Sequence, residues 1–170
     1  MDSAEYERKI ASRFAAFDQD GNGYIDRQDF SGATAALLAE FSTTARCDKG
    51  QALYSGAEAF WQGMAGIADV DGDQRVTRPE FITGAVKRLR DNPQRFAEIA
   101  RPFLHALIDI ADEDGSGVTP SAAERVLKVL GVEPTLAARV AVGLDADGDG
   151  RITEEEILSG FASYFVTPEP

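Results

Sequence analysis

Short acidic clusters recur four times along this chain of 170 residues. In each cluster, aspartates alternate with other residues, and the clusters begin at Asp18, Asp69, Asp112 and Asp145. Carboxylates packed this closely repel one another and raise each other's pKa unless a cation lies between them. The clusters therefore indicate sites for a hard cation that prefers oxygen ligands.

The fourth cluster opens a twelve-residue loop that offers an oxygen ligand at every position that Ca²⁺ needs. Gly150, at position six, permits the left-handed turn that folds such a loop around a point. Glu156, at position twelve, can supply two oxygens, which brings the shell to about seven, the number that Ca²⁺ prefers. The predicted ligands are Asp145, Asp147, Asp149, the backbone carbonyl of Arg151, Thr153 and Glu156.

The first loop, residues 18–29, follows the same pattern with one substitution. Asp29 stands where the fourth loop has a glutamate, and its side chain is one methylene shorter. A bidentate contact then requires the following helix to move inward, which favours more tolerance of the smaller Mg²⁺. The predicted ligands are Asp18, Asp20, Asn22, the backbone carbonyl of Tyr24, Asp26 and Asp29.

The second loop, residues 69–80, keeps every carboxylate but has Gln74 where a glycine is expected. A side chain in that left-handed position costs roughly 1–2 kcal/mol. This cost lowers the affinity about tenfold without abolishing binding. The predicted ligands are Asp69, Asp71, Asp73, the backbone carbonyl of Arg75, Thr77 and Glu80.

The third loop begins on the pattern with Asp112, Asp114 and Ser116 and then departs from it. Counted from Asp112, position nine is Pro120 and position twelve is Ala123, so no bidentate carboxylate is available. We expect this loop to bind weakly or to be empty and to act as a structural partner for loop four. In that pairing Thr119 is predicted to face Ile152.

Apolar residues at helical spacing precede and follow every cluster, as in the run Ile10, Phe14 and Phe17 before the first. The pattern predicts an all-α chain of eight helices in four helix–loop–helix units. The chain is broken at Asn92–Pro93, which favours two halves, residues 1–92 and 93–170.

Four such units with these loops resemble the EF-hand proteins. The layout is similar to that of the sarcoplasmic calcium-binding protein and calerythrin family, and we expect this chain to be a bacterial member. The long insertion between the first two units and the one degenerate loop are shared features. The resemblance implies two paired lobes packed compactly, with short β bridges between paired loops at residues such as Ile25 and Ile152.

Composition excludes several other classes of function. The net charge of −12 argues against nucleic acid and against an anionic membrane surface, both of which need basic residues. The apolar fraction of 44% argues against a disordered acidic chain. No basic leader or membrane-spanning run is visible, which favours the cytoplasm. Cys47 is the one cysteine, so no disulfide forms within the chain, and we expect it to be semi-buried.

An enzyme is not expected. His105 is the one histidine that could act as a base, and it lies among apolar residues, so we expect it in the core or at its edge. Light-emitting EF-hand proteins rely on several histidines, which this chain lacks. A Ca²⁺ buffer or signal modulator is favoured over a calmodulin-like sensor, because sensors expose a Met-rich groove and this chain has only Met1 and Met64. A structural module with inactive loops is the third possibility. We expect a monomer, and no target protein can be named.

Overall fold

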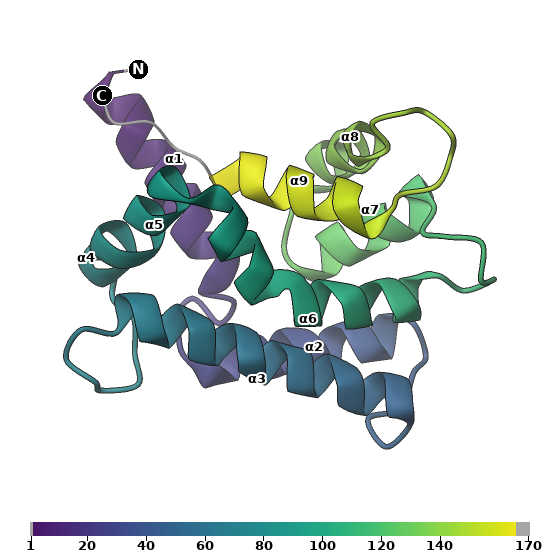
Figure 1. Ribbon diagram of the computed structural model, residues 1–170, viewed down its shortest axis with the longest axis horizontal. Helices are drawn as coiled ribbons and strands as arrows, with labels where there is room; N and C mark the ends of the chain where they lie inside the picture. The colour runs from purple at the N-terminus through teal and green to yellow at the C-terminus, as the bar shows by residue number, and fades with distance from the viewer. Residues whose placement is uncertain (1, 166–170) are drawn as a thin grey trace.

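The computed structural model describes residues 2–165, and within them all four expected units are formed (Figure 1). The units are α1 (Ser3–Phe17) with α2 (Arg27–Glu40), α3 (Asp48–Ala68) with the helical segment 78–91, α6 (Pro93–Ala111) with α7 (Pro120–Val129), and α8 (Pro134–Leu144) with α9 (Glu154–Phe165). The segment 78–91 is continuous and consists of α4 (Arg78–Glu80), the π-helical η1 (Phe81–Val86) and α5 (Lys87–Asp91). The predicted all-α class is confirmed.

Side chains that cap the backbone set the starts of these helices. Thr77 and Glu80 form a reciprocal capping box at the start of α4. Asn92 accepts a hydrogen bond from the amide of Arg95 at the start of α6. Pro120 is the first residue of α7, where its missing N–H costs nothing. These caps fix where each loop ends and its exiting helix begins.

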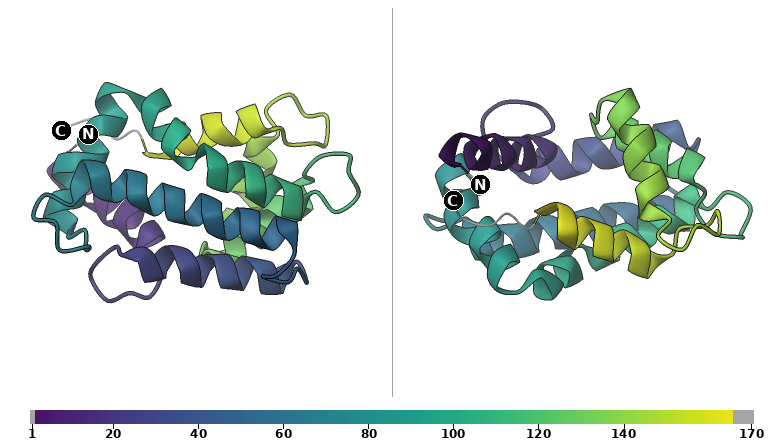
Figure 2. Two further views of the ribbon diagram at one scale, coloured as in Figure 1. Left: turned by 60° about the horizontal axis from the view of Figure 1, so that its bottom comes forward. Right: turned by 90° about the horizontal axis from the view of Figure 1, so that it is seen from above.

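One continuous apolar core runs through both halves of the chain. Helices α3 and α6, which come from different halves, make the most extensive contact between any two elements, and they lie side by side in Figures 1 and 2. The ring of Phe60 in α3 packs against Phe30 in α2, with centroids 5.1 Å apart, and against Phe103 in α6, at 6.1 Å. The two halves therefore share their interior, which holds the loops at fixed positions around it.

Two expectations about single residues are wrong. The His105 side chain is 65% exposed, and its Nδ1 lies 2.8 Å from Oε1 of Glu154. Cys47 is also exposed, because it caps α3, where its sulfur accepts from the amide of Gly50 and donates to the carbonyl of Thr44. Neither side chain belongs to the core.

None of the helices within residues 2–165 combines the length and the apolar character that crossing a membrane requires.

Candidate metal centres

The loops meet in pairs through short antiparallel bridges. Ile25 and Val76 exchange two backbone hydrogen bonds of 2.9 and 2.8 Å between the first and second loops. Ile152 of the fourth loop bridges to Val118 of the third. The bridge positions predicted at Ile25 and Ile152 are confirmed, but the partner of Ile152 is Val118, and the prediction of Thr119 is wrong.

In the fourth loop, carboxylate oxygens of Asp145, Asp147 and Glu156 all lie within 4.8 Å of one another. Backbone amides hold the first and last of these groups in place. Gly150 donates to Oδ2 of Asp145 at 2.8 Å, and Ala146 donates to Oε2 of Glu156 at 2.7 Å. The loop thus brings residues eleven positions apart in sequence to one point.

One oxygen in this loop has no partner. Oδ1 of Asp145 is buried and makes no hydrogen bond. Leaving a buried carboxylate oxygen unsatisfied costs free energy, and a cation at the centre of the loop would remove that cost.

The close packing of carboxylates in the fourth loop also changes the pKa of Asp147. The hydrogen bond from the amide of Asp149 acts to lower its pKa, but desolvation and the charges of Asp149 and Glu156 raise it above its usual value. The donor set and its geometry therefore fit a hard divalent cation.

In the first loop, the corresponding group is Asp18, Asp20 and Asp29. Asp29 is only 2% exposed, and its oxygens accept from the amides of Asp20 at 3.1 Å and Asp26 at 2.8 Å. Burial raises the pKa of Asp29 to about 6, although these backbone hydrogen bonds act to lower it. The ionised form of Asp29 is thus unfavourable without a nearby positive charge, and a cation bound in the loop would supply that charge.

In the second loop, Asp69, Asp71 and Asp73 converge. Glu80 lies outside this group of three and accepts from the amides of Val70 at 2.8 Å and Thr77 at 3.2 Å. Gln74 has a φ of +66°, the left-handed conformation that the loop pattern predicts for it.

Several other predicted ligands lie around these clusters and order the loops. Asn22 accepts from the amide of Tyr24 at 3.0 Å, and Asp149 from that of Arg151 at 2.8 Å. Asp26 caps α2, Thr77 caps α4, and Thr153 accepts from the amide of Glu156 at 3.1 Å.

The third loop, residues 112–122, forms no such cluster of three carboxylates. It is one residue shorter than the others, because its seventh residue, Val118, bridges to Ile152, which is the eighth residue of the fourth loop. Thr119 caps α7, as the position-nine residues cap the other exiting helices, so Thr119 takes position nine. The placement of Pro120 at nine and Ala123 at twelve is therefore wrong, because Ala122 falls at position twelve. Ala122 has no carboxylate, so the third loop still lacks a ligand at position twelve.

The sequence did not predict the contact between the side chain of Arg151, in the fourth loop, and the third loop. Its Nη2 lies 3.9 Å from Oδ2 of Asp114, so a positive charge from the fourth loop already approaches the few acids that remain. A hydrogen bond from the Ser116 hydroxyl is the main cause that lowers the pKa of Asp114, with the charge of Arg151 adding to it. In the sequence, the only signal for this contact is the positive charge of Arg151 at position seven of the fourth loop.

Comparison with known proteins supports this interpretation of the loops. The family model for the EF hand matches residues 10–32 and 144–162. Calerythrin of Saccharopolyspora erythraea is 22% identical over 166 residues, which cover 96% of this chain and 94% of calerythrin. A sarcoplasmic calcium-binding protein of amphioxus shares the fold, with a TM-score of 0.68, 17% identity and coverage of 95% and 93% of the two chains.

A calcium-binding protein of Streptomyces coelicolor is far more similar. It is 64% identical, with a TM-score of 0.94, and the alignment covers 96% of this chain and 99% of that one. Such identity over nearly the full length of both chains, with the loops described above, shows that the protein belongs to the EF-hand calcium-binding proteins, and it resembles calerythrin and the sarcoplasmic calcium-binding proteins.

Proposed function

We propose that the protein binds three calcium ions, in the first, second and fourth loops, and that the third loop stays empty. The observation that carries this proposal is the buried Oδ1 of Asp145, which lacks a hydrogen-bond partner at the centre of the fourth loop. The convergence of three carboxylates in each of the first and second loops supports the same role there. The third loop lacks such a group and has Arg151 beside Asp114.

The first loop is the proposed site that also accepts Mg²⁺. Asp29 is short, and its two oxygens are held by the amides of Asp20 and Asp26. A monodentate aspartate at position twelve leaves fewer protein oxygens, which suits the six-coordinate Mg²⁺ better than Ca²⁺.

The proposed role is that of a cytoplasmic buffer or signal modulator, acting as a monomer without enzymatic activity. A sensor opens its helix pairs and exposes a flexible Met-rich groove. Here Met64 is fully buried, and Trp61 is 1% exposed beside it on α3, the helix that packs along α6. Opening the first pair would break this shared interior, so the geometry favours a fixed structure. The pairs 1–92 and 93–170 are its proposed units.

Calorimetric titration with Ca²⁺, in the absence and presence of Mg²⁺, tests the number of sites. We expect three Ca²⁺ per chain, with Mg²⁺ weakening one of the three events. Four tight sites, or fewer than two, would contradict the proposal.

Hydrogen–deuterium exchange tests the role. A buffer should gain protection in all three active loops on Ca²⁺ addition, with no loss of protection in α3 or α6. A sensor would lose protection in these helices as their apolar faces open. The Trp61 emission adds a local readout of the first half, which should change little in a buffer.

A further inference from the structure

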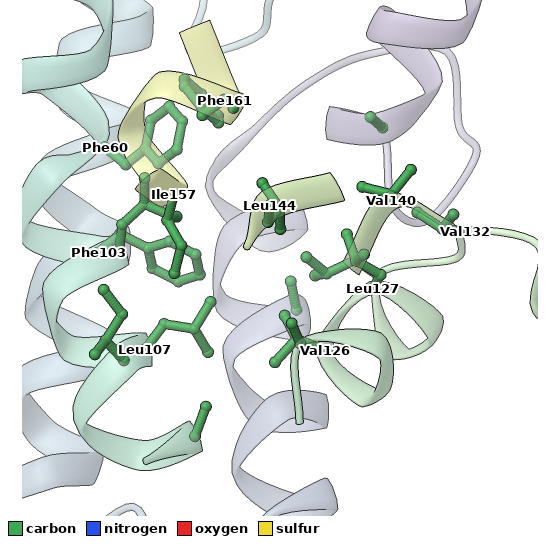
Figure 3. Close-up of a pocket in the computed structure, with 18 of the residues that line it drawn as sticks. Phe60, Phe103, Leu107, Val126, Leu127, Val132, Val140, Leu144, Ile157 and Phe161 are labelled. Atoms are coloured by element: carbon green, nitrogen blue, oxygen red, sulfur yellow. The ribbon is translucent and has the colours of Figure 1, made fainter. Parts of the chain in front are cut away.

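An apolar cavity of about 320 Å³ lies between the two halves of the molecule. Its walls come from helices of both halves, so it exists only because the halves pack on each other. Pockets that hold small molecules in proteins measure about 300–1,000 Å³. Figure 3 shows Phe60, Phe103 and Leu107 on one side of it and Val126, Leu127 and Val140 on the other.

The wall of the cavity carries no positive charge. Among the described residues that line it, only Gln19 and Asp29 are polar, and none is basic. Both oxygens of Asp29 are engaged by backbone amides, and Nε2 of Gln19 donates to two backbone carbonyls, one of them that of Leu130 at 3.1 Å. An anionic ligand such as a fatty acid would therefore bury its charge without a partner, which is costly. The lining selects a neutral ligand.

Aromatic rings shape one side of the cavity. Phe60 lies edge-on to Phe103, with centroids 6.1 Å apart, and to Phe161, at 6.0 Å. All three rings line the cavity. Edge-to-face and offset arrangements with such rings stabilise an aromatic guest beyond the burial of its surface. The ring cluster therefore favours a flat aromatic ligand over a flexible alkyl chain.

The cavity reaches the surface at α8. Leu136 and Val140 of this helix line the cavity, yet they are 44% and 37% exposed. Two half-exposed apolar side chains at the edge of an apolar cavity give a small ligand a way in.

We propose that this cavity is a binding site for a neutral, aromatic, apolar small molecule. The site adjoins the first proposed calcium centre, because Asp29 contributes both to the first loop and to the cavity wall, and it includes none of the clustered carboxylates of the second and fourth loops.

The neutral dye N-phenyl-1-naphthylamine, whose fluorescence rises in apolar surroundings, tests the proposal with the full chain in saturating Ca²⁺. We expect saturable binding of one dye per chain. Val140→Trp, which places a large ring at the mouth, should weaken binding by about tenfold or more, because added bulk in an occupied space is poorly tolerated. Val142→Trp is the matched control, since Val142 lies on the same helix, is 66% exposed and does not line the cavity; it should leave the affinity unchanged.

A second pair of variants tests the opposite wall and protects against loss of folding in the first. Ala33→Leu in α2 fills the cavity and should weaken dye binding, whereas Ala36→Leu on the exposed side of α2 should not. Dodecanoate, an anionic chain, should fail to displace the dye. The proposal is overturned by the absence of saturable dye binding, by equal effects in each matched pair, or by displacement with dodecanoate. It is also overturned if dye affinity falls as the protein dimerises with rising concentration, because the cavity would then be covered by a second copy.

Discussion

Gly56 of α3 lies directly against the backbone of Phe103 in α6. A Cβ added to Gly56 would lie 2.7 Å from Cα of Phe103 and 2.8 Å from its nitrogen. Backbone atoms in the middle of a helix cannot swing aside, so this position sets how closely the two halves approach. The same contact holds Phe103 in the wall of the apolar cavity.

Replacing Gly56 by alanine should therefore destabilise the protein. We expect Gly56→Ala to lower the free energy of unfolding by about 1–3 kcal/mol, the usual cost of overpacking. Gly66→Ala is the matched control on the same helix, because a Cβ at Gly66 meets nothing within 4 Å. It should raise stability by roughly 0.5–1 kcal/mol, since alanine is the better helix former. Urea unfolding of both variants in Ca²⁺ measures the two effects, and equal signs would show that the helices are not in close contact here.

Gln74 has a strained backbone that glycine would relieve. Its φ of +66° costs a residue with a Cβ about 1–2 kcal/mol, while glycine loses about 0.4–1 kcal/mol through its freer unfolded chain. Gln74→Gly should then stabilise the protein by about 0.5–1 kcal/mol, or about 1–4 °C in Tm. Gln74→Ala keeps the strain while it removes the rest of the side chain, so its Tm should stay near that of the parent. Equal stabilisation by both variants would assign the effect to the side chain.

Features that depend on neighbouring residues were predictable from the sequence. The capping box of Thr77 and Glu80 and the start of α7 at Pro120 are local, and the structure has both. The expectation that His105 lies in the core or at its edge was wrong, and the reason is also local. Successive helical residues turn by 100°, so the face that buries Phe103 and Leu107 leaves His105 pointing outward.

Features that depend on pairing between distant segments were not predictable. The partner of Ile152 is Val118, and this bridge, together with the cap that Thr119 gives to α7, shows that the third loop is one residue short. From the sequence alone, Thr119 is counted at position eight and Pro120 at position nine, and no local signal shows that one residue is missing before them. The cavity is formed by helices from both halves, so no stretch of sequence marks it.

Glu156→Gln should remove the fourth site. An amide has one oxygen to offer and no charge, so the bidentate contact at position twelve is lost, and we expect the affinity to fall by at least about tenfold. Calorimetry should then find two tight Ca²⁺ sites per chain. The control is Glu124→Gln in α7, which removes a carboxylate paired with Lys128 at 3.0 Å on the helix after the third loop. It should leave three sites, and the loss of a site in this variant would mean that the third loop binds.

The same pair of variants links binding to stability. Because Ca²⁺ binds only the folded form, each site adds about 2.7 kcal/mol when free Ca²⁺ is one hundred times Kd. Chelation should lower the Tm of the parent and of Glu124→Gln by similar amounts, and that of Glu156→Gln by less. A Tm that does not respond to chelator at low ionic strength would contradict occupied calcium sites altogether.

Asp29→Glu tests why the first loop should accept Mg²⁺. The added methylene brings the carboxylate within bidentate reach, as at position twelve of the fourth loop, which suits Ca²⁺ and its larger shell of oxygens. Asp29 is 2% exposed, but it borders the apolar cavity, so the longer side chain has room to adjust. We expect Ca²⁺ affinity at this loop to rise and Mg²⁺ competition to fall, measured by Ca²⁺ titration with and without Mg²⁺. Glu156→Asp makes the reverse change in the fourth loop and should move its preference towards Mg²⁺. If neither substitution alters the competition, the length of the side chain at position twelve does not set the choice between the two ions.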